Sequence, residues 1–249
     1  MSQYVLLNHK DHSELRINTT RSRELGDDIM YVMTFPHEFR DIQSCYPICF
    51  RKDPDTGVFH PVALFGLEPN QNLFLENDHW DASYIPLMVR RHPFLIGMKS
   101  TNGNTKDPKP VISIDIGNPR VNKSEGERLF TEDGNPSEFT HQITKILESI
   151  HLGYEDNSKF INKLIQLDLL ESFTLEVTLT DGSKHELSGF YTIKETSLSA
   201  LSSDQLSSLH SEGYLLPIYM AVASHSRMRV LVNKKDERCL LYTSDAADE

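Results

Sequence analysis

The first residues able to do chemistry are two histidines near the start of the chain. His9 and His12 flank Lys10 and Asp11, and Glu14 follows them. A histidine with a carboxylate two positions later occurs in iron and zinc sites, where a distant histidine completes the ligand set. The chain holds 11 histidines, so chance pairing is easy, and the charged, turn-like setting favours an exposed loop. A metal-dependent enzyme using the His9/His12 region therefore stays an alternative.

The second candidate is an aromatic and basic block that suggests binding. Trp80, Tyr84 and two successive arginines lie within about a dozen residues. Aromatic and arginine side chains are favoured at binding surfaces because they bury a large area and offer hydrogen bonds. If the turn at 68–72 folds back, its polar residues lie beside this block. We predict a groove for a peptide, carbohydrate or partner protein formed by Glu68, Asn70, Asn72, Trp80, Tyr84, Arg90 and Arg91.

Each of these features also has a purely structural interpretation. Trp80 then belongs to the core, and the two arginines pair with Asp78 or Asp81. Under the same structural interpretation, Asp115 and Arg120, which are separated by a proline, form a salt bridge at the end of a strand. Tyr214 and Tyr219 are most simply core residues.

Sequence motifs for catalysis and for cofactors are missing. The chain contains no His-Glu-x-x-His, no paired Cys-x-x-Cys, no glycine-rich phosphate loop and no Gly-x-Ser-x-Gly. Acid–base pairs form in space, so the sequence leaves them open. We predict no cofactor and lean towards a protein that is not an enzyme.

Composition narrows the class of protein further. The net charge of −11 argues against general nucleic-acid binding, which needs clustered Lys and Arg. The N-terminus shows no signal peptide, and no apolar run is long enough to span a membrane. Cys45 and Cys49 are expected to be reduced and packed. Cytoplasmic residence follows as the expectation.

The last eleven residues differ in character from the rest. Residues 239–249 back-translate codon by codon into a sequence resembling a transposase end and adapter used in sequencing libraries. We interpret them as an artefact and place the end of the natural coding sequence near Arg238. Without this tail, which holds three acidic residues, the net charge is −8.

Turn residues and apolar periodicity predict an α+β fold with antiparallel β hairpins in both halves and C-terminal helices packed on them. Hairpins are expected around the turns at 53–57 and 180–183, and the polar segment 100–109 is expected to be a surface loop or insertion. Residues 139–150 predict a helix that is capped by Ser137 and ends at Gly153. A final helix is predicted from near Pro217 through Val230. We predict a β-rich N-terminal lobe at 1–120, a connecting segment at 121–137 and an α+β lobe at 138–238.

Short blocks along almost the whole chain resemble a known family. They include Ala63–Leu75, Arg90–Gly97, Pro119–Arg120, Asp181–Gly182, Gly213–Leu215 and Ile218–Met220. None is very specific alone, but about a dozen in order are similar to the SapC family of bacterial surface-layer-associated proteins, whose biochemistry is unassigned. Gln71, where an acidic residue is expected, is a minor departure.

This resemblance implies a setting more than a reaction. Similar proteins occur beside TonB-dependent receptors, which implies a protein partner from a surface or uptake gene cluster. The favoured interpretation is a non-enzymatic accessory or binding protein in surface-layer or outer-membrane uptake physiology, serving the surface from inside the cell. The alternatives are the metal-dependent enzyme and a structural surface-layer component.

Overall fold

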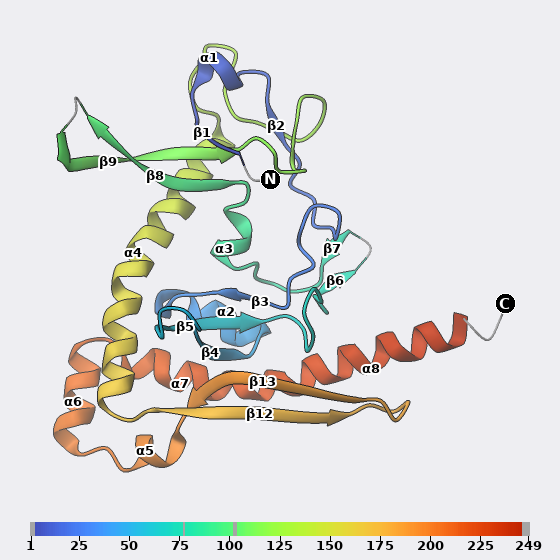
Figure 1. Ribbon diagram of the computed structural model, residues 1–249, viewed down its shortest axis with the longest axis vertical. Coiled ribbons are helices and arrows are strands. Elements are labelled where there is room, and N and C mark those ends of the chain that lie inside the picture. The colour runs from blue at the N-terminus through green and yellow to red at the C-terminus, as the bar shows by residue number, and fades with distance from the viewer. Residues whose placement is uncertain (1–2, 77, 102–103, 246–249) are drawn as a thin grey trace. The chain divides into compact units, whose positions relative to one another are not determined.

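The computed structural model describes residues 3–76, 78–101 and 104–245 of the 249-residue chain (Figure 1). The chain divides into two compact units whose segments alternate along the sequence. The first unit consists of residues 1–27, 77–79 and 87–152, and the second of residues 28–76, 80–86 and 153–249. The sequence boundary predicted at 121–137 stays a prediction.

The first unit contains two small antiparallel sheets. One has the strand order β1-β9-β8, and the other places β2 between β10 and β11. Two short helices and the beginning of a long one accompany them. The bounds are β1 (Tyr4–Leu6), α1 (His9–His12), β2 (Arg16–Ile17), α3 (Leu87–Arg90), β8 (Phe94–Thr101), β9 (Asn104–Asp115), β10 (Val121–Asn122) and β11 (Glu127–Arg128).

The surface loop predicted for residues 100–109 is wrong over the described part of that segment. β8 and β9 form one long hairpin there, in which Lys99 pairs with Lys109 and Thr101 with Asn104. The hairpin starts at an apolar end where Phe94 pairs with Ile114. Ladder hydrogen bonds join backbone groups, so the pairing continues into polar sequence once the apolar end has set the register.

The second unit is built on a five-stranded antiparallel sheet in the order β12-β13-β4-β5-β3. The two predicted hairpins, β4–β5 and β12–β13, are both confirmed. Asp53 accepts the Thr56 amide hydrogen bond at 2.7 Å in the first turn, and Gly57 and Gly182 supply positive φ angles. The strand bounds are β3 (Tyr31–Met33), β4 (Ile48–Lys52), β5 (Phe59–Leu64), β12 (Leu170–Thr178) and β13 (Lys184–Ile193).

Helices cover this sheet, which confirms the predicted α+β class. Ile48 and Cys49 of β4 and Ala63 and Leu64 of β5 are fully buried, so both faces of these inner strands are covered. Helix α7 packs against α2, β4 and β13.

The remaining elements are η1 (Pro36–Glu38), α2 (Phe39–Cys45), β6 (Leu75–Glu76), β7 (His79–Trp80), α4 (Glu138–Gln166), α5 (Glu195–Ser199), α6 (Ser203–Ser211), α7 (Leu215–Ser224), η2 (His225–Arg227) and α8 (Met228–Asp245).

The long helix α4 begins as predicted but does not end at Gly153. The Ser137 hydroxyl accepts the Thr140 amide hydrogen bond at 3.2 Å, which caps the N-terminus. Gly153 lies inside the helix. A Cβ atom there would lie 2.6 Å from Cγ of Phe35 and 2.9 Å from Cε1 of His37. This glycine therefore serves close packing and not helix termination.

The predicted single C-terminal helix is also wrong, because η2 separates α7 from α8. At the end of α7, the Ser224 hydroxyl donates to the Ala221 carbonyl at 2.6 Å and accepts from the Ile48 amide at 2.9 Å. This side chain links the helix end to the central strand β4 at the point where the helix changes form. Among the described helices, none is long and apolar enough to cross a membrane.

Candidate functional site

The two histidines proposed as metal ligands have structural contacts in the first unit. Nδ1 of His12 accepts the Asn8 amide hydrogen bond at 3.1 Å, and His12 is buried. His9 packs edge-on against Phe130, with 5.3 Å between ring centroids, and its ring lies over Gly134. Within the described residues, no three His, Cys, Asp or Glu side chains are placed to hold a metal ion. Both histidines thus help to fix the fold around α1.

The aromatic residues of the predicted groove form an internal network of the second unit. Trp80 is 3% exposed, and its Nε1 donates to the Tyr46 hydroxyl at 2.7 Å. That hydroxyl donates in turn to the Tyr84 carbonyl. The Tyr84 hydroxyl donates to buried Glu38 at 2.8 Å. In this network Trp80 and Tyr84 fix the segment that carries them, as the structural interpretation of Trp80 expected.

The polar turn predicted to border the groove is divided between the interior and the surface of the same unit. Asn72 is fully buried, and its side chain accepts the Phe74 amide hydrogen bond at 3.0 Å. Asn70 is exposed and has a φ of 56°. The sequence had predicted these residues as one group, and the structure separates buried from exposed members.

Glu68 is partly exposed and forms ion pairs with His185 at 2.6 Å and Lys235 at 3.1 Å. Burial acts to raise the pKa of Glu68, but the hydrogen bonds and charges of Lys235 and His185 outweigh it and lower that pKa. Glu68 therefore links the turn to β13 and α8. Contact of this residue with a partner stays a prediction.

The two predicted arginines belong to the first unit. Arg90 is exposed, and neither it nor Arg91 forms an ion pair with a described residue. Nη1 of Arg91 donates to the Phe94 carbonyl at 2.9 Å, whereas its Nε is buried without a hydrogen-bond partner. The expected pairing with Asp78 or Asp81 does not occur, and Asp81 instead binds Lys234 at 2.6 Å.

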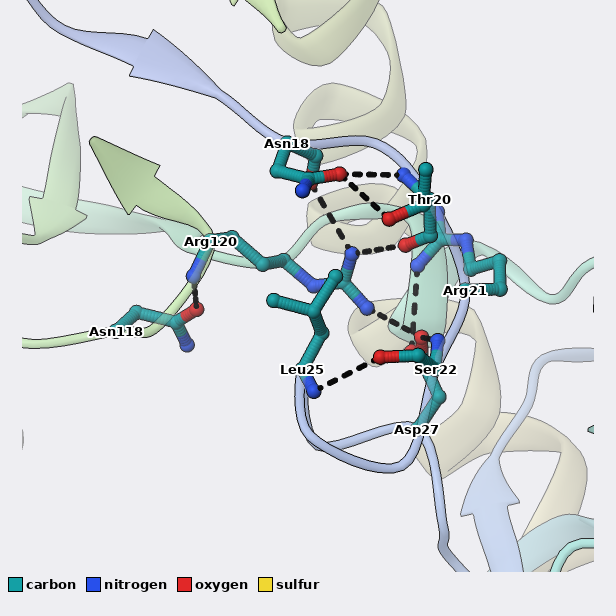
Figure 2. Close-up of polar contacts among 8 residues, drawn as sticks. All are labelled: Asn18, Thr20, Arg21, Ser22, Leu25, Asp27, Asn118 and Arg120. Atoms are coloured by element: carbon teal, nitrogen blue, oxygen red, sulfur yellow. Dashed lines mark hydrogen bonds and ion pairs between the residues drawn. The ribbon is translucent and has the colours of Figure 1, made fainter. Parts of the chain in front are cut away.

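Close to these arginines lies a buried ionic cluster that Figure 2 shows. The guanidinium group of Arg120, 2% exposed, donates to the carbonyls of Asn18 at 3.2 Å and Thr20 at 2.7 Å, and to the Asp27 carboxylate. Nη1 of Arg21 lies 3.4 Å from the other Asp27 oxygen. Two guanidinium groups thus share one buried carboxylate.

The loop around the cluster is held by its own backbone. The Ser22 amide donates to Asp27 at 3.0 Å, and the Leu25 amide donates to the Ser22 hydroxyl at 3.3 Å (Figure 2). On the other side, the Asn118 side chain accepts the Arg120 amide hydrogen bond at 3.0 Å. These contacts fix the loop that carries Arg21 and Asp27 and the backbone at Arg120.

Positive charge exceeds negative charge at this cluster. Burial lowers the pKa of Arg21; Asp27 opposes that shift, whereas Arg120 and Arg90 add to it. Burial also lowers the pKa of His92 to about 4, and the charges of Arg91 and Arg120 act in the same direction. We call Arg21, Arg90, Arg120 and Asp27 the arginine cluster. Arg21 and Arg120 share one carboxylate, and the charge of Arg90 also acts on Arg21, so the cluster is suited to accept a further anion.

The sequence indicated only part of this cluster. Arg90 was predicted for binding from its position in the basic block, whereas the structural interpretation paired Arg120 with Asp115. In the structure Asp115 accepts backbone hydrogen bonds from Gln3 at 2.6 Å and Gly117 at 3.2 Å, and Arg120 binds Asp27, 93 residues away. Neither local spacing nor composition signals a contact over that separation.

Comparison with known proteins gives one match. No curated protein and no solved structure is similar enough to match this chain. The model of the SapC family matches residues 7–231, which extend across both compact units and include all members of the arginine cluster. The chain therefore belongs to the SapC family.

Proposed function

We propose that this SapC-family protein is a non-enzymatic accessory or binding protein that receives an acidic group of a protein partner at the arginine cluster. The observation that carries the proposal is the excess of guanidinium charge, in which Arg21 and Arg120 share Asp27 while exposed Arg90 adds a third cation. Family membership supports a setting in surface-layer or outer-membrane uptake physiology.

The geometry favours binding of a carboxylate over loose electrostatic attraction. A guanidinium group presents its donors in a rigid fork that matches the two oxygens of a carboxylate. Arg120 and Arg21 are already held against Asp27, so these two side chains lose little entropy when a ligand approaches. Hydrogen bonds to charged groups contribute about 1.5–3 kcal/mol each. One well-placed acidic side chain therefore suffices for a measurable effect.

The net charge of the chain narrows the class of partner. At −11, the protein as a whole repels polyanions, so a local cluster of three arginines suits a single acidic side chain better than nucleic acid. We propose a protein partner from a surface or uptake gene cluster, and a cytoplasmic location for the complex. Of the residues predicted for binding, Arg90 belongs to this cluster, and Glu68, Asn70 and Arg91 remain candidates for a separate contact.

The experiment begins with the tagged protein expressed in its native host. A partner that co-purifies is identified, produced separately and titrated by calorimetry against the wild type, Arg90→Ala and Arg229→Ala. Arg90→Ala should weaken binding at least tenfold without changing the melting temperature, because Arg90 is exposed. Arg229→Ala is the matched control, since Arg229 is an exposed arginine of α8 in the second unit.

Two outcomes would overturn the proposal. One is a partner that binds Arg90→Ala as tightly as the wild type. The other is a purified wild type that turns over a substrate at a rate lost together with a single side chain. Cell fractionation on the same strain tests the proposed cytoplasmic location.

A further inference from the structure

A cavity of about 280 Å³ in the second unit lies outside every site predicted above. It is formed where the η1–α2 segment, α4 and the start of α7 meet. Its walls bring together two carboxylates, a guanidinium group, a phenol and apolar side chains. The argument uses Arg40, Asp156, Glu212, Tyr214, Leu216 and Met220.

One wall of the cavity is acidic. The Tyr214 hydroxyl donates to Oδ1 of Asp156 at 3.2 Å, and burial together with the Asp156 charge raises the pKa of Tyr214 to about 12. The phenol therefore stays protonated and keeps donating. Oε1 of Glu212 is held by Lys163 and Ser208, each at 2.6 Å. Oδ2 of Asp156 has no hydrogen bond from a described residue, so this oxygen is available to a cationic group.

The opposite charge comes from Arg40 of α2. Arg40 is exposed and its guanidinium group forms no ion pair with a described residue, Asp156 included. Because Arg40 and Asp156 line the same cavity without binding each other, each can bind a ligand group of opposite charge. A ligand with a single charge could pair with only one of Arg40 and Asp156. The other side chain would then face a group of its own sign or an uncharged group.

Apart from His37, the remaining side chains of the lining are apolar. Leu216 is 53% exposed although it is a large aliphatic residue, and Met220 lies one turn further along α7. Tyr219 on the same helix is 51% exposed, so its predicted place in the core is wrong, whereas that of Tyr214, 8% exposed, is confirmed. An apolar group covering Leu216 and Met220 would remove this surface from water.

We infer that this cavity binds a zwitterionic α-amino acid with an apolar side chain. Asp156 receives the ammonium group, Arg40 receives the carboxylate, and Leu216 and Met220 contact the side chain. The volume suits one amino acid better than a peptide of several residues, since sites for larger ligands start at roughly 300 Å³. The inference is independent of the proposed function, because the arginine cluster belongs to the other unit.

Calorimetric titration with L-phenylalanine and L-leucine tests the inference. N-acetyl-L-phenylalanine lacks the ammonium group and L-phenylalanine amide lacks the carboxylate, so each should bind at least tenfold more weakly than L-phenylalanine. The dipeptide Phe-Phe distinguishes a peptide from a free amino acid. If Phe-Phe binds more tightly than L-phenylalanine, the assignment to a free amino acid is overturned.

Three variants make the assignment specific. Asp156→Asn keeps an acceptor for the Tyr214 hydroxyl but removes the charge, and Arg40→Gln removes the guanidinium group. Each should weaken L-phenylalanine binding at least tenfold. Glu155→Gln, an exposed neighbour of Asp156 on α4, is the control and should bind like the wild type.

The inference fails if no apolar amino acid binds the wild type, or if Asp156→Asn binds as the wild type does. Melting temperatures of all three variants identify any loss of binding that comes from unfolding. Arg90→Ala should bind L-phenylalanine normally, so that failure of this inference and failure of the proposed partner surface give different results.

Discussion

Replacing Asp27 with asparagine should destabilise the first unit strongly while keeping the shape of the side chain. Asp27 faces both Arg120 and Arg21, and the Arg120 side chain is only 2% exposed. Asp27→Asn leaves that buried guanidinium group without the carboxylate that neutralises it. Removing one member of a buried ion pair costs about 3–5 kcal/mol, because the remaining charge stays away from water.

A second buried aspartate in the same unit provides the matched control. Asp115 is 5% exposed and accepts hydrogen bonds from the amides of Gln3 and Gly117, but it forms no ion pair with a described residue. Asp115→Asn should therefore cost only about 1–3 kcal/mol, the range for a weakened hydrogen bond to a charged acceptor. The difference between the two variants isolates the contribution of the guanidinium groups.

Urea denaturation followed by circular dichroism measures both free energies of unfolding. Hydrogen exchange of the peptide covering residues 18–27 locates the effect, since the Arg120 contacts to Asn18 and Thr20 hold that loop. Equal losses for Asp27→Asn and Asp115→Asn, or a loss below about 1 kcal/mol for Asp27→Asn, would refute the idea that the carboxylate neutralises buried Arg120. The double variant Asp27→Leu with Arg120→Met should lose less stability than the two single variants added together.

Three further predictions follow from the packing and from the shifted pKa values. Gly153→Ala should lower the free energy of unfolding by about 1–2 kcal/mol in spite of alanine's better helix propensity, because the new Cβ would meet Phe35 at 2.6 Å. Urea denaturation followed by the fluorescence of the single tryptophan, Trp80, measures this change. A variant more stable than the wild type would show that Phe35 moves freely. Burial raises the pKa of Cys49 to about 12, so iodoacetamide at pH 8 should leave Cys49 unmodified in the native protein and modify it in urea. Mass spectrometry measures the modification. Rapid alkylation of Cys49 in the native protein would contradict its burial. His92 has a pKa of about 4 in the folded protein and 6.5 when unperturbed, so between these pH values the unfolded chain takes up a proton that the folded chain does not. The free energy of unfolding should therefore fall by up to about 3 kcal/mol as the pH is lowered through this interval. His92→Asn should lose less stability over the same interval, and identical pH profiles of unfolding for the two proteins would argue against the shift.

Local sequence signals predicted the hairpins and failed where packing decides. The turns at Asp53 and Asp181 are correct because glycine and aspartate act within a few residues of their own position. Gly153 was interpreted as a helix end, but the helix continues through it. Glycine occupies this position because Phe35 and His37 fill the space that a side chain would need. A glycine signals backbone freedom and close packing alike, and the sequence alone does not separate the two.

The candidate sites show the same division. Arg90 was proposed for binding from its residue type and its place in an aromatic block, and that role stays a prediction. Asp27 was missed, since its importance comes from Arg120, 93 residues further along. The cavity at Tyr214 was missed as well, because it joins segments around residues 40, 156 and 214 that are distant in the sequence. Trp80 was predicted at a binding surface but is a hydrogen-bonded residue of the interior.

The most direct test of an anion-receiving arginine cluster is titration of a fluorescently labelled peptide with one glutamate among uncharged residues against the wild type, Arg90→Ala and Arg229→Ala, followed by fluorescence polarisation at two salt concentrations. The wild type and Arg229→Ala should bind the peptide, with affinity that falls as salt increases. Arg90→Ala should bind at least tenfold more weakly at the lower salt concentration. Equal binding by the wild type and Arg90→Ala, or no binding by the wild type at low salt, would contradict the account.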